Sequence, residues 1–187
     1  MEVYLDTKEH YLLCSDDEKI GLGDEFLEPF KYLNGYEGRL SMVGACNGLI
    51  CLGDPCFMDE PHIFVGNPSI RKLVALPIPS KPQRPQHAVV FGFGAHPTTY
   101  EYKVIRIVYL MRNGYVFQIP PKTEVYTQGA ASWRDITSGR PPQGLLMFAS
   151  PQAFVNGAVH WIGIAKKRTR GRYNSIVSFD IGVGRIL

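Results

Sequence analysis

Three regularly spaced cysteines are the residues of this sequence best suited to metal chemistry. Cys46, Cys51 and Cys56 form one evenly spaced series with four residues between neighbours, and not the separate pairs, with two to four residues between partners, that zinc sites usually use. Cys51 lies inside an apolar segment, where a cysteine behaves as a small buried hydrophobic residue. We therefore expect core packing or a loop thiol, with metal binding as the less favoured alternative.

A Gly-x-Gly motif at Gly92 and Gly94 could begin a dinucleotide-binding loop. The third glycine of such a loop is missing, and Pro97 would block the helix that must follow it. We expect a turn at this place and no bound cofactor.

Histidine is the side chain most able to transfer protons near neutral pH. His160 lies beside Trp161 in a predicted strand, and we expect it to be a hydrogen-bonded structural residue rather than a ligand or catalyst. The sequence contains no Gly-x-Ser-x-Gly elbow, no phosphate loop and no His-Glu-x-x-His motif. We therefore predict no catalytic, cofactor-binding or metal-binding residues and a protein that is not an enzyme. The five histidines share no ligand spacing: His10, His62, His87, His96 and His160.

A basic segment at 166–172, Lys-Lys-Arg-Thr-Arg-Gly-Arg, is the sharpest charged feature. Its simplest interpretation is a solvated loop between two strands, and the alternative is contact with an acidic partner, nuclear import machinery or nucleic acid. No aromatic residue interrupts the segment, so base stacking has little support.

Two further segments have side chains that often occur in protein interfaces. Trp133 and Arg134 are residue types common in binding hot spots, but arginines at Arg71 and Arg185 repeat the same position, which favours a structural role at a turn. The proline-rich segment 77–85 is predicted to be extended. It connects two repeats or, alternatively, presents a surface to a partner.

The elements that must position these residues are short strands joined by many turns. Glycine (19) and proline (14) make up 33 of the 187 residues, about 18% against an ordinary 12% or so. Hydrophobic residues account for 45% and charged residues for 20%, which argues against disorder. The best helix candidate is 24–30, so we expect few or no helices.

The net charge, the length of the apolar runs and the N-terminal residues indicate the kind of partner and the cellular compartment. A net charge of +3 is too small to indicate nucleic acid as a partner. No apolar run reaches the length of about 18 residues needed to cross a membrane, and the N-terminus lacks the features of a secretory signal. With four cysteines in all, including Cys14, we expect an intracellular protein of the cytoplasm, the nucleus or both.

The sequence contains three similar units. Apolar runs occur at 47–52, 102–107 and 156–161, and aligning Leu49, Val104 and Ala158 gives spacings of 55 and 54 residues. A second strand, a turn and a third strand follow each run. The second strands are predicted at 63–65, 124–126 and 176–180, and the third strands at 71–73, 133–136 and 185–187.

A strand-rich repeat of about 50 residues is typical of a kelch-like propeller blade. A small antiparallel sheet cannot bury both of its faces alone, but sheets stacked radially can. We therefore predict an all-β fold, a partial kelch-like β-propeller of about three antiparallel blades. A β-sandwich with accidental spacing is the alternative.

Five segments resemble, in order and spacing, the plant F-box-associated (FBA) domain. They are 44–52 with 67–72 and 76–77, then 92–94 with 102–106, 124–127 with 132–136, 153–161 and 176–180. The resemblance covers about 42–187, whereas 1–41 matches weakly. It implies a kelch-like propeller whose family recruits target proteins to a cullin-based ubiquitin ligase, while a preceding F-box binds the ligase adaptor.

The chain departs from the family pattern in two ways. No F-box helices precede Glu2, and the chain ends after a strand of the third unit although the family normally continues. We expect 1–187 to be one incomplete domain that binds a target protein and binds the adaptor only if an F-box lies upstream. A non-functional remnant and a propeller-hosted enzyme are the alternatives. The protein-binding residues are not predicted.

Overall fold

The computed structural model describes residues 40–53, 61–70, 72–80, 87–112, 116–117, 121–136, 145–166 and 171–187. Several expectations concern residues outside these ranges. They concern the helix at 24–30, Cys14, Cys56, His10, Arg71, residues 81–85 of the proline-rich segment and residues 167–170 of the basic segment.

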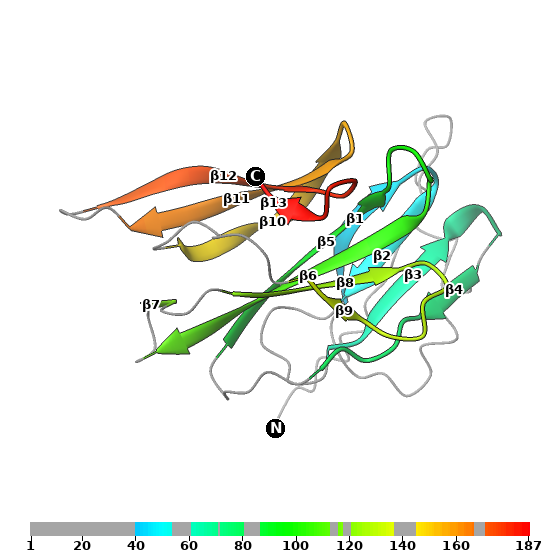
Figure 1. Cartoon of the computed structure of the whole chain (residues 1–187), viewed down its shortest axis with the longest axis horizontal. Coiled ribbons are helices and arrows are strands. Elements are labelled where there is room, and N and C mark those ends of the chain that lie inside the picture. The colour runs from blue at the N-terminus through cyan, green and yellow to red at the C-terminus, as the bar shows by residue number, and fades with distance from the viewer. Residues whose placement is uncertain are drawn as a thin grey trace, which may run out of the picture.

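The described chain forms three antiparallel meanders (Figure 1). The N-terminal sheet contains β1 (Ser41–Cys46), β2 (Leu49–Gly53), β3 (Ile63–Asn67) and β4 (Lys72–Ala75), with the 3₁₀ turn η2 (Pro68–Ile70) between the last two. The middle sheet contains β5 (His87–Ala95), β6 (Tyr102–Arg112), β8 (Lys122–Thr127) and β9 (Arg134–Asp135), and the short β7 (Val116–Phe117) pairs with β6. The C-terminal sheet contains β10 (Leu145–Val155), β11 (Ala158–Lys166), β12 (Arg172–Asp180) and β13 (Arg185–Ile186).

The expected all-β fold with about three antiparallel blades is confirmed. Strands are hydrogen-bonded in sequence order within each sheet, and the described residues include no α-helix. In particular, they contain no helix with the length and hydrophobicity needed to span a bilayer.

Each unit has one more strand than the sequence indicated. The three predicted strands of every unit are the second, third and fourth strands of a sheet, and β1, β5 and β10 precede them. The aligned position also shifts in the middle unit, because Tyr102, and not Val104, begins its second strand as Leu49 and Ala158 begin theirs.

The three first strands lie together at the centre of the molecule. β1 contacts both β5 and β10, and β5 contacts β10. The remaining strands of the N-terminal sheet, β2–β4, extend outward from this centre in order (Figure 1). This is the radial arrangement expected for blades of a propeller.

The middle sheet is buried on both faces. Alternate residues of β5 and β6 enter two different clusters: Phe91 and Val104 pack toward the N-terminal sheet, whereas Ile105 and Ile107 pack toward the C-terminal sheet. Every residue from Val104 to Tyr109 is at most 2% exposed. A strand covered on both faces should be almost continuously apolar, which explains the apolar run seen in the sequence.

Two of the three innermost hairpins turn on an Asn-Gly pair. Asn47 and Gly48 have φ values of 48° and 76°, and Asn156 and Gly157 have values of 51° and 78°. Two consecutive positive φ angles define a type I′ turn, whose twist suits a two-residue hairpin. The middle sheet uses a longer loop between Ala95 and Tyr102.

The Gly92-Phe93-Gly94 segment is not the turn that we expected but lies inside strand β5. A Cβ atom at Gly92 would lie 2.5 Å from Cζ2 of Trp161, and one at Gly94 would overlap the ring of Phe154. The indole of Trp161 donates a hydrogen bond to the carbonyl oxygen of Phe91 at 2.8 Å. The glycines therefore allow the C-terminal sheet to approach the backbone of β5.

Candidate functional site

A groove of about 400 Å³ opens between the N-terminal and middle sheets. The two sheets pack closely near the centre, where Cys51 and Ile63 meet Phe91 and Phe93, and the groove lies along the outer part of the same interface. Its lining is mostly apolar and comes from both sheets: Leu49, Val65, Gly66, Asn67, Lys72, Val74, Leu76, Phe93, Tyr102, Val104, Tyr126, Gln128 and Gly129.

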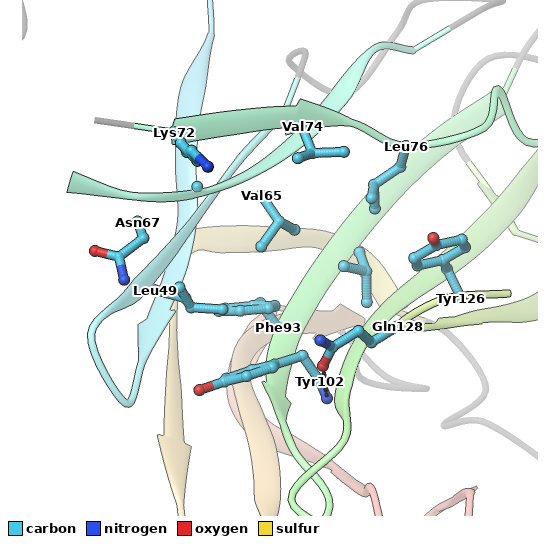
Figure 2. A pocket seen from close by; sticks show the side chains of 13 residues that line it. Leu49, Val65, Asn67, Lys72, Val74, Leu76, Phe93, Tyr102, Tyr126 and Gln128 are labelled. Carbon is cyan, nitrogen blue, oxygen red and sulfur yellow. Dashed lines mark hydrogen bonds between the residues drawn. The ribbon is translucent and has the colours of Figure 1, made fainter. Parts of the chain in front are cut away.

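One wall of the groove is built from alternate residues of β4 and the segment after it. Lys72, Val74 and Leu76 are two residues apart, so they lie on one face of the extended chain. Val65 of β3 is paired with Val74 and adds to the same face. Figure 2 shows these side chains opposite those of Phe93 and Tyr102.

The opposite wall is an aromatic surface. The rings of Phe93 and Tyr102 are stacked, with centroids 5.9 Å apart and planes 13° apart. The Tyr102 hydroxyl lies 3.5 Å from the carbonyl oxygen of Asn47, to which it donates. The amide N–H of Gln128 donates to the carbonyl oxygen of Tyr102 at 2.9 Å, which holds the β8 end beside the ring.

Trp133 packs against Tyr126, which also lines the groove. Its indole nitrogen donates to the carbonyl oxygen of Pro77 at 2.6 Å, and its ring contacts Tyr126 with centroids 5.7 Å apart. The residue is partly buried against the cluster that fills the inner interface. The structural interpretation of Trp133 is therefore supported, since the side chain links β8 to the proline-rich segment.

Arg134 and Arg185, which we aligned with each other in the repeats, lie at the beginnings of fourth strands. Arg134 is the first residue of β9 and Arg185 the first of β13, and both are exposed. Their shared position agrees with the sequence alignment of the units.

A buried ion pair closes the interface next to the groove, and sequence reasoning did not find it. Nη1 of Arg106 lies 2.6 Å from Oε2 of Glu124, and both side chains are at most 4% exposed. The two residues are directly opposite each other on β6 and β8. Arg106 is the single charged residue between Val104 and Leu110, and knowledge of the register between this strand and the next would have identified Glu124 as its partner.

Ser80 and Lys122 complete this polar cluster. Arg106 donates to the carbonyl oxygen of Ser80 at 2.9 Å, and the Ser80 hydroxyl donates to Glu124 at 2.6 Å. Lys122 donates to Glu124 at 2.8 Å. The hydrogen bonds of the cluster to Ser80 hold residues 76–80 against the middle sheet. They thereby restrict the position of Leu76, which lines the groove.

Burial and the neighbouring charges shift the pKa values of Glu124 and Arg106 in opposite directions. Burial alone would raise the pKa of the Glu124 carboxyl, but the hydrogen bonds from Lys122 and Ser80 and the charge of Arg106 outweigh it and hold the pKa below its ordinary value of 4.5. Burial lowers the pKa of Arg106 despite the attraction of Glu124. Within the described residues, Nε and Nη2 of Arg106 have no hydrogen-bond partner.

The cysteines and the histidine that we considered for metal or acid–base chemistry do not line the groove. Cys46 and Cys51 are buried free thiols, and burial raises the pKa of both. His160 has the hydrogen bond that we expected, because its Nδ1 lies 2.7 Å from the Ser178 hydroxyl. In the part of the chain that the structure describes, no three His, Cys, Asp or Glu side chains form a group able to hold a metal ion.

The groove is mostly apolar and carries a positive charge at one side. Among the described residues that line it, Lys72 is the one charged residue, and Asn67 and Gln128 are the side-chain amides. Oδ1 of Asn67 already accepts from the Ser69 N–H at 3.0 Å. An apolar groove with one cation at its side is suited to bind apolar groups and to place an anion, and it offers no carboxylate or imidazole for proton transfer.

Most of the chain is similar to one family of known proteins. A family model described as the F-box associated beta propeller domain matches residues 29–185. F-box protein At3g07870 of Arabidopsis thaliana is 30% identical over 189 residues, which cover 92% of this chain and 43% of that protein.

Two other Arabidopsis thaliana proteins are similar over shorter segments. F-box/kelch-repeat protein At2g43445 is 25% identical over 138 residues and F-box protein At2g43440 is 30% identical over 139 residues, each covering 74% of this chain. The chain spans less than half the length of these relatives. No solved structure matches.

Proposed function

This chain belongs to the F-box associated beta propeller domain family, and from this we propose that it is a non-enzymatic module that binds target proteins for a cullin-based ubiquitin ligase. In this function the three sheets hold the groove between the N-terminal and middle sheets in a fixed shape, and the target docks there. An F-box in the same polypeptide would bind the ligase adaptor. The family match over residues 29–185 is the observation that carries the proposal.

The chemistry of the groove supports binding rather than catalysis. Its walls are formed by aliphatic side chains on one side and by Phe93, Tyr102 and Tyr126 on the other. Burying one Leu or Phe side chain contributes roughly 1.5–3 kcal/mol, which corresponds to about tenfold to a hundredfold in affinity. A few such side chains give a useful affinity when the groove is already formed.

The rigid surroundings of the groove also favour this function. The Arg106–Glu124 pair lies at its end and the Trp133–Pro77 hydrogen bond lies behind its aromatic wall. Prearranged walls lose little entropy when a partner binds. We also propose that the protein acts inside the cell, in the cytoplasm, the nucleus or both, with a target protein as its partner and with no membrane or nucleic acid involved.

The proposal is tested by joining residues 1–187 behind an unrelated functional F-box and expressing the fusion in plant cells. We expect a defined set of proteins to become ubiquitinated and less abundant. The same F-box alone and the 187-residue chain alone are the controls, and neither should affect that set. If the fusion changes the ubiquitination of no protein beyond these controls, the proposed function is wrong.

A further inference from the structure

The outer strand of the N-terminal sheet, β4, has one edge with no partner strand among the described residues. The N–H of Leu76 donates to the carbonyl oxygen of Ile63 at 2.8 Å. Backbone groups alternate in direction along a strand, so those of Val74 and Lys72 also point toward β3, to which both residues are paired. The N–H and carbonyl groups of Leu73 and Ala75 therefore point away from the sheet, and no described strand lies on that side of β4.

This edge has few of the features that normally prevent pairing. Proteins protect exposed edges with charged side chains, prolines or bulges. β4 carries one charge, Lys72 at its first position, and its pairing with β3 has no bulge. Val74 is 63% exposed although it is branched and apolar. The strand thus combines free backbone groups with an exposed apolar side chain.

The unpaired edge and the groove belong to the same strand. Lys72, Val74 and Leu76 line the groove, whereas Leu73 points to the other face and packs against the small cluster that includes Leu52 and Phe64. A strand added beside β4 would present every second side chain to the groove side. In Figure 2 the space faced by Val74 and Val65 is bounded by Phe93, Tyr102 and Tyr126.

We propose that an extended segment of a partner protein adds to β4 as a fifth strand of the N-terminal sheet and places alternate apolar side chains in the groove. The proposal rests on the proposed function and identifies the kind of target segment that it would recognise. Backbone hydrogen bonds to Leu73 and Ala75 would provide affinity, and the groove would select the side chains. Addition of a strand to an exposed edge is an established mode of peptide recognition.

Charge complementarity specifies one further side chain of the partner. Within the described residues, Lys72 is the only charged residue of the groove lining and has no ion-pair partner. We infer an acidic side chain in the partner segment beside Lys72, followed at two-residue intervals by the apolar side chains beside Val74 and Leu76. In an antiparallel arrangement the same order is reversed along the partner.

The probe for this proposal is a phage-displayed library of random nonapeptides, selected against the full 187-residue chain. We expect enrichment of peptides with an acidic residue and two large apolar residues at alternate positions. Synthetic copies of the enriched peptides are then measured for affinity by fluorescence anisotropy. A selection that yields no such pattern overturns the proposal.

The variant Ala75→Pro distinguishes backbone pairing at the strand edge from nonspecific hydrophobic binding. Proline is tolerated at an edge where the N–H points away from the sheet, but it removes one donor and puts a ring in the path of an added strand. We expect roughly a tenfold loss of peptide affinity, in line with loss of a backbone hydrogen bond and of close approach. Ala75→Ser keeps the N–H and is the matched control, with affinity unchanged.

Lys72→Glu provides a second variant that leaves the backbone intact, because Lys72 is exposed. We expect about fivefold weaker binding of acidic peptides and recovery when the acidic residue of the peptide is replaced by lysine. Equal binding of both peptides by both proteins overturns the acidic assignment. Thermal melting of every variant verifies that it is folded, so a loss of affinity is not confused with unfolding.

Other occupants of the edge give different results. If the chain is dimeric by light scattering and Ala75→Pro makes it monomeric, a second copy occupies β4 and the proposal is wrong. The F-box fusion distinguishes failure of this proposal from failure of the proposed function. A fusion with Ala75→Pro that still ubiquitinates the same targets overturns strand addition alone, whereas inactivity of the unmodified fusion overturns the function.

Discussion

The side-chain amide of Gln152 pairs with the backbone of Phe93 as a neighbouring strand would. Its Oε1 accepts from the Phe93 N–H at 3.0 Å, and its Nε2 donates to the Phe93 carbonyl oxygen at 2.9 Å. Gln152 lies in β10 and Phe93 in β5. A Cβ at Gly44 of β1 would overlap the same amide, so all three innermost strands meet at this side chain.

We predict that Gln152→Glu destabilises the protein. A carboxylate keeps one acceptor but loses the donor to the Phe93 carbonyl oxygen, and it places negative charge beside that oxygen. The free energy of unfolding should fall by about 1–3 kcal/mol, measured by urea denaturation at pH 7. Gln128→Glu makes the same chemical change at an exposed residue and should change stability by less than about 0.5 kcal/mol.

We predict that Gly92→Ala weakens the contact between the middle and C-terminal sheets. The added methyl would lie 2.5 Å from Cζ2 of Trp161 and 2.9 Å from Cγ1 of Val159, so buried side chains must move. Overpacking of this kind costs about 1–3 kcal/mol, observable as a lower thermal midpoint. At Gly53 the nearest atom is 3.2 Å from the added methyl, and Gly53→Ala should have the smaller effect; the reverse order would contradict the packing described here.

We predict strong coupling between Arg106 and Glu124. Arg106→Met removes the buried cation of the pair and leaves the Glu124 carboxylate with the partly exposed Lys122 as its cation, which should cost about 3 kcal/mol. Removing both charges with Arg106→Met and Glu124→Leu should recover most of this loss, because two apolar side chains can replace a buried pair. A double-mutant cycle in urea measures the coupling. Additive losses would show that the two side chains act independently.

The pKa of Glu124 predicts a pH dependence of stability. Its pKa is lower in the folded protein than the ordinary 4.5, so the ionised carboxyl stabilises the fold above that value. This contribution is lost as the pH falls through the folded pKa, somewhere below 4.5. Glu124→Gln should therefore be less stable than the original protein at pH 7, and the difference should shrink on acidification below pH 4.5. A difference in unfolding free energy that stays constant with pH contradicts this account.

The second to fourth strands of each unit could be predicted from the sequence, whereas the first strands could not. β5 contains Gly92 and Gly94, and β10 contains Pro151, which are residues that normally disfavour strands. The glycines are required by the close approach of Trp161 and Phe154. Pro151 lies within an irregularity of the β10–β11 pairing between Ala149 and Ala153, where the ladder needs fewer donors. Contacts between sheets therefore overcame local preference.

The groove could not be predicted because it depends on the angle between two sheets. Val74 and Tyr102 are far apart in the sequence, and neither belongs to a motif that suggests binding. The segment from Lys72 to Leu76 is short and nearly continuously apolar, so it does not distinguish a binding wall from an ordinary strand. The Asn-Gly turns at Asn47 and Asn156 are determined by local chemistry, but we had counted both pairs as the beginnings of apolar runs.

The central claim is that targets bind at the groove between the N-terminal and middle sheets, and site-specific photo-crosslinking tests it most directly. A photoreactive phenylalanine analogue is placed at Val74, which lines the groove, or at Ile176 of the C-terminal sheet, which is similarly apolar and exposed. Both are introduced into the F-box fusion in the presence of a ubiquitinated target. We predict a crosslink to the target from position 74 and none from position 176; a crosslink from 176 without one from 74 would contradict the account.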